Sequence, residues 1–179
     1  MEGKSKGLAV TVAIVAAIGI SLLAMLAVLN RRDQSVGLNQ EIQYDDFAFS
    51  VLGVRKASTL ERGDSPVADR FYYVVTIRIS NHAKRVNYTF KTTAAILVDD
   101  RGREFHLSTA GQHALESTLI NRCSEPIPAG ASCITEIAFD LPAEARPSQL
   151  RISEGGAIGD ILDVVFYGRK RIELAASQQ

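Results

Sequence analysis

The sequence is poor in several residues on which other protein classes depend. Its 179 residues include no tryptophan, only two cysteines and only five prolines. Lysine plus arginine and aspartate plus glutamate both total 20, so the formal net charge is zero. A neutral chain has neither the basic surface of a nucleic-acid-binding protein nor a strongly acidic tail. We therefore expect no nucleic-acid partner.

Motifs of catalysis and cofactor binding are missing as well. Neither a G-x-S-x-G nucleophile turn nor an H-E-x-x-H zinc motif occurs. The three histidines, His82, His106 and His113, fit surface or half-buried positions better than a nucleophile–base pair. The glycines of segment 155–159 precede a predicted strand rather than a helix, which disfavours a phosphate-binding loop. We expect neither an enzyme nor a cofactor.

One long segment lacks charge altogether. Leu8 to Leu29 reads LAVTVAIVAAIGISLLAMLAVL. As a helix rising about 1.5 Å per residue it would span about 33 Å, against a hydrocarbon core of about 30 Å. A buried helix of a soluble protein is the alternative, although such a helix rarely stands at a terminus between charges. We expect a membrane-spanning helix over 8–29.

The same segment could be a cleaved signal peptide. Signal sequences have apolar regions of about 7–15 residues, which is shorter than this one. Ala27 is a poor cleavage point because bulky side chains precede it, and no cysteine follows the segment to carry a lipid. An uncleaved anchor is therefore favoured, with residues 1–7 as the cytoplasmic N-terminus and residues 30–40 as a polar linker.

Both cysteines, Cys123 and Cys133, flank a turn sequence with two prolines and a glycine, Pro126 to Gly130. A disulfide between them would contribute roughly 3 kcal/mol and would persist outside the reducing cytosol. Two unpaired buried thiols are the alternative; zinc would need four ligands, and no histidine lies between them. Two lysines before the apolar segment balance two arginines after it. The cysteines therefore decide the orientation, and we expect the C-terminal domain outside.

After residue 40 the apolar spacing becomes that of strands. Phe47 to Val51 alternates, and Gly53 suits a bulge. Arg70 to Asn81 reads RFYYVVTIRISN and is the clearest strand, because β-branched and aromatic residues dominate it. One face of this strand is predicted to be buried, and the other is predicted to be a mixed outward face. The buried set is Phe71, Tyr73, Val75, Ile77 and Ile79, and the outward set is Tyr72, Val74, Thr76, Arg78 and Ser80.

Turn signals divide the rest of the chain. DDRG, starting at Asp99, predicts a hairpin turn, and Asp99 with Asp100 supplies far fewer oxygens than the roughly 6–8 that calcium takes. Ser108 to Leu119 predicts one or two helical turns capped by Ser108 or Thr109. The strands predicted around these turns are Ala94–Val98, Arg103–Leu107, Ser132–Leu141, Gln149–Ser153 and Ile161–Phe166.

About seven to nine short strands in about 135 residues predict an all-β fold, an antiparallel two-sheet sandwich of the immunoglobulin-like type. The domain is expected over 41–174, followed by a tail at 175–179. The chain has no tryptophan to match the buried one of antibody domains, and its cysteines are too close together for their inter-sheet disulfide.

Four segments carry a resemblance to a known family. They are FAFSVLGVRKA (47–57), FYYVVTIRISN (71–81), AILVDDRGREF (95–105) and IPAGASCITEIAFDLP (127–142). Their order resembles a telokin-like, immunoglobulin-type domain of bacterial exported proteins and lipoproteins, to which the mycobacterial immunoprotective secreted antigen is related in fold. The resemblance covers about Glu41 to Leu174. It implies a sandwich without catalytic residues and without an assigned function.

These observations favour a single-pass membrane protein whose domain binds an envelope protein or a surface ligand. The first alternative is a structural accessory subunit of an envelope complex, with helix contacts through Gly19 and Ser21. The second is a hydrolytic enzyme. The basic cluster Arg169-Lys170-Arg171 is interpreted as protection of an edge strand or as a partner contact.

Overall fold

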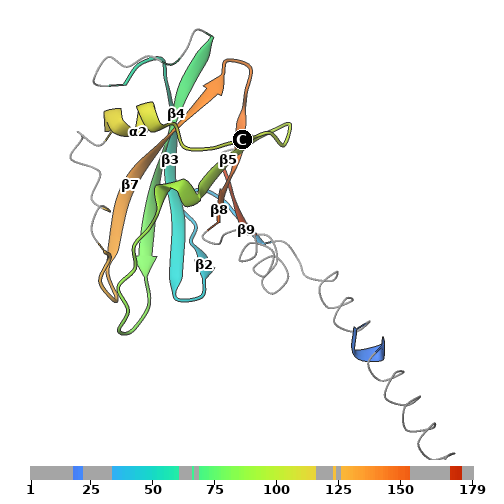
Figure 1. Cartoon of the computed structure of the whole chain (residues 1–179), viewed down its shortest axis with the longest axis vertical. Coiled ribbons are helices and arrows are strands. Elements are labelled where there is room, and N and C mark those ends of the chain that lie inside the picture. Colours follow the sequence, from blue (N-terminus) through green and yellow to red (C-terminus); the bar gives the residue numbers. More distant parts are fainter. Residues whose placement is uncertain are drawn as a thin grey trace, which may run out of the picture.

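The computed structural model describes residues 18–21, 34–60, 66, 69–115, 123, 126–153 and 170–174. Within this part of the chain, nine strands form two sheets that pack face to face around one main core (Figure 1). The predicted all-β, two-sheet sandwich is thereby confirmed.

The four-stranded sheet has the order β2-β3-β4-β7 and is antiparallel throughout. Alternating apolar residues place one face of each long strand in the core. The register between β3 and β4 shifts between Val51 and Gly53, at the predicted bulge. The strands are β2 (Ile42–Tyr44), β3 (Phe47–Ala57), β4 (Arg70–Asn81) and β7 (Ser132–Pro142).

The five-stranded sheet has the order β1-β9-β8-β5-β6. Its strands are β1 (Gln34–Val36), β5 (Ala95–Asp99), β6 (Glu104–Phe105), β8 (Pro147–Ile152) and β9 (Lys170–Glu173). β1 and β9 run parallel, so the prediction of a purely antiparallel sandwich is wrong for this pair. β1 also lies inside the segment 30–40 that was predicted to be a linker. Backbone pairing with β9 makes these three residues part of the sheet.

A cluster of aromatic side chains fills one end of the core. The ring of Phe49 packs edge-on against Tyr44 and Tyr88, with centroids 5.5 and 6.4 Å apart, and lies 5.8 Å from the ring of Phe90. Phe47 stacks on Tyr88 with centroids 4.0 Å apart. These contacts join β2 and β3 to the connection between β4 and β5, and such ring pairs add stability beyond the area they bury.

The two ends of the sandwich can be followed from strand to strand. Gln34 pairs with Lys170, whose carbonyl accepts a hydrogen bond from the Tyr44 hydroxyl at 3.3 Å. Tyr44 pairs with Phe47, and Phe47 pairs with Asn81, where β4 ends. We call this the entry end, because the chain enters the domain here at Gln34. The opposite end, where β3 ends, β4 begins and β7 leads into β8, is the far end (Figure 1).

A second apolar cluster covers the outer side of the four-stranded sheet. Tyr72 and Val74, predicted to face outward, are 2% and 0% exposed because the helix α2 (Thr109–Leu115) packs over them beside β7 (Figure 1). That part of the prediction is wrong, and it is also wrong for Ser80, which is 7% exposed, whereas Arg78 of the same face is exposed, as predicted. The helix and its cap are confirmed, since the Ser108 hydroxyl accepts a hydrogen bond from the amide of Gly111 at 3.2 Å.

The outer edge of β7 is closed by polar contacts. The side-chain amide of Gln112 donates to the carbonyl of Glu136 at 3.2 Å and accepts from the amide of Ala138 at 3.3 Å, as a neighbouring strand would. The amide of Ser108 donates to the carbonyl of Ala138 at 2.8 Å. An edge strand with its backbone groups occupied is protected from pairing with another chain.

Several predicted features lie outside the described residues. They are the turn at 61–65, the strand at 161–166, the glycines of 155–159 and the tail at 175–179. Of the apolar segment 8–29, the structure describes 18–21, which are helical and exposed. Within the described residues no helix is long and apolar enough to cross a membrane.

The close packing of α2 gives a direct stability test. A Cβ added at Gly111 would lie 2.8 Å from the Cβ of Ala138 and 2.9 Å from the ring of Tyr72. Gly111→Ala should therefore lower the free energy of unfolding by about 1–3 kcal/mol, because helix and sheet must move apart. Urea unfolding of the full-length protein in mild detergent measures this. Gly53→Ala is the control, since a Cβ there meets no atom within 4 Å. Equal stability of the two variants would contradict the proposed packing role.

Candidate functional site

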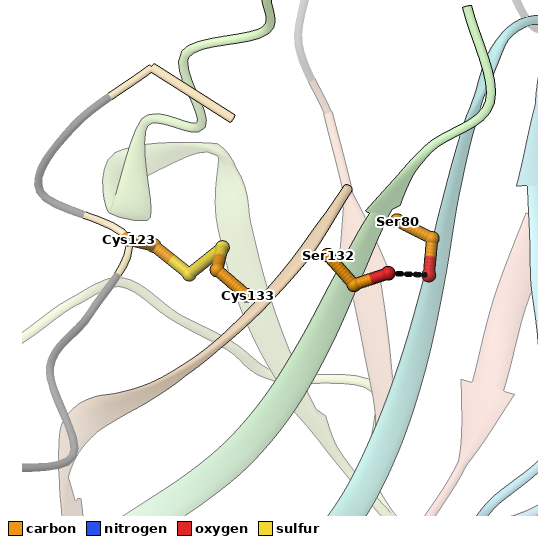
Figure 2. Close-up of a disulfide and its surroundings, with 4 residues drawn as sticks. All are labelled: Ser80, Cys123, Ser132 and Cys133. Carbon is orange, nitrogen blue, oxygen red and sulfur yellow. Dashed lines mark hydrogen bonds between the residues drawn. A yellow bond between two sulfur atoms is a disulfide. The ribbon is translucent and has the colours of Figure 1, made fainter. Parts of the chain in front are cut away.

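Cys123 and Cys133 form a disulfide in the structure, with their Cα atoms 5.5 Å apart. Cys133 is the second residue of β7, and Cys123 precedes the turn that leads into this strand (Figure 2). The bond therefore ties the chain ahead of the turn to the beginning of an edge strand. In the turn itself, Gly130 has a φ of 75°, a backbone conformation that glycine adopts without strain.

Hydrogen bonds beside the disulfide hold the entry end together. The hydroxyl of Ser132 donates to that of Ser80 at 3.1 Å, between β7 and β4 (Figure 2). The side-chain amide of Asn81, 1% exposed, donates to the carbonyls of Val86 at 2.8 Å and Ile127 at 2.9 Å. Sequence reasoning missed this role of Asn81; an asparagine that ends a strong strand is the signal that could have indicated it.

The three histidines are exposed in the part of the chain that the structure describes. His82 and His106 are exposed, and the Nε2 atom of His82 lies 2.6 Å from Glu41. His113 lies in the last turn of α2, exposed. No group of three or more His, Cys, Asp or Glu side chains that could hold a metal ion occurs among the described residues.

Asp99 organises the turn at the far end. Its carboxylate is fully buried and accepts hydrogen bonds from the amides of Arg101 at 3.0 Å and Arg103 at 2.8 Å. The Nε atom of Arg103 donates to its second oxygen at 2.7 Å. Gly102 completes the hairpin with a φ of 76°. The predicted hairpin turn is confirmed, and the protein itself occupies both oxygens of Asp99.

Arg103 connects this turn to the β7–β8 connection. Burial opposes ionisation of Asp99, but the hydrogen bonds from Arg103 and Arg101 prevail and lower its pKa. The hydrogen bonds that Arg103 donates to Asp99 and Glu144 raise the pKa of its guanidinium. The pKa of the Glu144 carboxyl is lowered by its own backbone amide and then by Arg103, whose Nη1 lies 3.2 Å away. Two carboxylates therefore share one guanidinium.

A polar groove of about 460 Å³ lies at the far end, beside this ion-pair network. β3 and β4 contribute Lys56 and Tyr73, the β5–β6 turn contributes Asp100 and Arg101, and the β7–β8 connection contributes Ala143 to Arg146. Lys56 is held over the ring of Phe71, with its Nζ atom 3.8 Å from the ring centroid. These residues are far apart in the sequence, so the groove could not be predicted from it.

The groove carries charges of both signs. Lys56, Arg101 and Arg146 are exposed cations, while Asp100 and Glu144 supply two carboxylates. The hydroxyl of Tyr73 is 3.4 Å from the Ala145 carbonyl. Ionic groups of both signs in an open hollow suit the recognition of a polypeptide segment with complementary charges. No serine, cysteine or histidine is among the described residues that line the groove.

The comparisons with known proteins identify a family. A family model described as a domain of unknown function, DUF4352, matches residues 36–160. The chain belongs to the DUF4352 family. No curated protein matches this DUF4352 chain.

Three solved structures are similar to this DUF4352 domain. MPT63, a secreted protein from Mycobacterium tuberculosis, is 12% identical with a TM-score of 0.56, over 80% of this chain and 99% of MPT63. An uncharacterised β-sandwich protein from Clostridium difficile is 11% identical with a TM-score of 0.52, over 82% and 97% of the two chains. The yjhA protein from Bacillus subtilis is 10% identical with a TM-score of 0.53, over 78% and 99%. At these identities the likeness is one of fold, and the resemblance to the telokin-like domain is confirmed.

The shared guanidinium predicts a pH dependence. Because the folded-state pKa of Asp99 and of Glu144 is lowered, their stabilisation is complete above the unfolded carboxyl pKa of about 4 and is lost as the pH falls further. Asp99→Asn should lower the free energy of unfolding at pH 7 by about 1–3 kcal/mol, since its amide cannot satisfy Arg103. In Asp99→Asn the free energy of unfolding, measured by urea unfolding at a series of pH values, should also fall less steeply as the pH is lowered. Asp100→Asn, at the exposed neighbour, is the control; a fall in Asp99→Asn as steep as in the unsubstituted protein would contradict the role of the pair.

Proposed function

We propose that this protein is a membrane-anchored, extracytoplasmic recognition domain that holds a segment of an envelope protein in the groove at the far end. The groove, built from four separate parts of the chain and lined by unlike charges, is the observation that carries this proposal. The domain contributes no catalysis and needs no cofactor. Its partner is a polypeptide rather than a nucleic acid.

The uncharged segment 8–29 supports the anchor, since it is long enough to span a bilayer. The disulfide between Cys123 and Cys133 supports a location outside the reducing cytosol. With its short tether at the entry end, the domain presents the far end and its groove away from the bilayer. Loops exposed on a rigid sandwich are the usual places for binding residues.

The groove is tested by photo-crosslinking in intact cells. A photoreactive amino acid at Ala143, an exposed position in the groove, should give a discrete adduct with one envelope protein. The double change Arg101→Glu and Arg146→Glu should abolish that adduct, because it reverses two of the three groove cations. Arg78→Glu, on the exposed face of β4, should leave the adduct unchanged. Adducts that survive the double change, or that appear equally from Thr109 on α2, would argue against recognition by the groove.

The same cells provide a control for topology. A membrane-impermeant thiol reagent should label Cys123 and Cys133 only after reduction, because both sulfurs are oxidised and outside. Labelling without reduction would contradict the disulfide. Absence of labelling after reduction, with labelling in lysed cells, would place the domain inside. The thiol labelling therefore distinguishes an error in the proposed location from an error in the proposed binding surface.

A further inference from the structure

The entry end carries an exposed basic loop that the recognition groove does not use. It follows β4 and comprises residues 82–91, HAKRVNYTFK. Val86 at its tip is 60% exposed, a high value for a large apolar residue. Lys84 and Arg85 precede it and Lys91 follows, all exposed and without an ion pair to any residue that the structure describes.

The base of this loop is held firmly while its tip projects. The side chain of Asn81 accepts a hydrogen bond from the amide of Ala83 at 3.0 Å and donates to the carbonyl of Val86 at 2.8 Å. Tyr88 exchanges backbone hydrogen bonds with Ile127 at 2.9 and 2.7 Å. The exposed apolar side chain of Val86 is therefore presented by a fixed backbone rather than by a loose chain.

The charge of the surroundings is mixed, but the tip of the loop is wholly basic. Glu41 lies 2.6 Å from His82, at the start of the loop. Asp45 and Asp46 form the neighbouring turn, and the carbonyl of Asp46 accepts the amide of His82 at 2.7 Å. These carboxylates lie beside the base of the loop, whereas segment 84–91 contains three cations and no carboxylate.

The tether keeps this loop near the bilayer. The proposed anchor ends at Leu29 and β1 begins at Gln34, which leaves five residue steps with a reach of at most about 18 Å. Gln34 lies at the entry end, the same end as Asn81 and the loop that follows it (Figure 1). With the proposed anchor, the tether therefore keeps Gln34, and with it the entry end, within about 18 Å of the end of the membrane span.

On the basis of the anchor in the proposed function, we propose that the loop 82–91 docks on anionic phospholipid headgroups. Val86 enters the interface between headgroups and acyl chains, while Lys84, Arg85 and Lys91 contact the phosphates around it. An exposed apolar side chain with cations next to it in the sequence is typical of surfaces that bind anionic bilayers. Docking here would hold the sandwich upright, with the groove at the far end directed outward.

Val86→Trp provides the test, because the chain contains no other tryptophan and its fluorescence reports from one position. The full-length variant is reconstituted into phosphatidylcholine vesicles with and without phosphatidylglycerol. We expect a blue-shifted emission, quenched by brominated acyl chains, only in the vesicles that contain phosphatidylglycerol. Adding Lys84→Glu and Arg85→Glu, or raising the salt concentration, should remove the shift, because both weaken the attraction to phosphate.

Ala143→Trp, at the exposed far end, is the matched control and should give the same emission in both vesicles. An equal shift of Val86→Trp in both lipids, or none in either, would overturn the proposal. A blue shift of Val86→Trp that appears in native membranes but in neither kind of vesicle would also overturn the proposal, because a membrane protein rather than lipid would then cover the loop. Flotation of the vesicles separates the two inferences: a chain that fails to float lacks the anchor, whereas one that floats without a shift lacks only the docking loop.

Discussion

The parallel pairing of β1 with β9 decides which end of this sandwich faces the segment that precedes it. Three residues, Gln34 to Val36, pair with Lys170 to Ile172 and thereby bring the entering chain to the end where β4 finishes. The groove lies at the opposite end, where β3 ends and β4 begins. The pairing of β1 with β9 therefore sets where both proposed surfaces, the groove and the basic loop, lie relative to the entering chain.

A second constraint is the closure of β7, the edge of the four-stranded sheet. The disulfide ties its beginning, Gln112 occupies its middle, and Arg70 donates to the carbonyl of Asp140 at 2.6 Å near its end. An open edge of this length would be a template for pairing with other chains. Its closure removes β7 from the edges at which another chain could pair, whereas β1, β2 and β6 remain edge strands of the described sheets.

Local patterns predicted most of the strands, because alternation and turn residues act over a few positions. β4 begins and ends where predicted, and the turn at Gly130, the Asp99 hairpin and the Ser108 cap are also confirmed. Contacts between residues far apart in the sequence could not be predicted from these local patterns. β1 is too short to show a period and pairs with residues more than a hundred positions away. Tyr72 and Val74 look like an outward face until α2 covers them.

In the proposed orientation, the domain stands on the bilayer with the entry end toward the lipid and the far end away from it. Paramagnetic relaxation from gadolinium-labelled headgroups, measured on backbone amides of the full-length protein in nanodiscs, tests this orientation most directly. We expect strong relaxation for residues 84–87 and little for residues 100–103 and 143–146. The reverse gradient, or equal relaxation at both ends, would contradict this orientation.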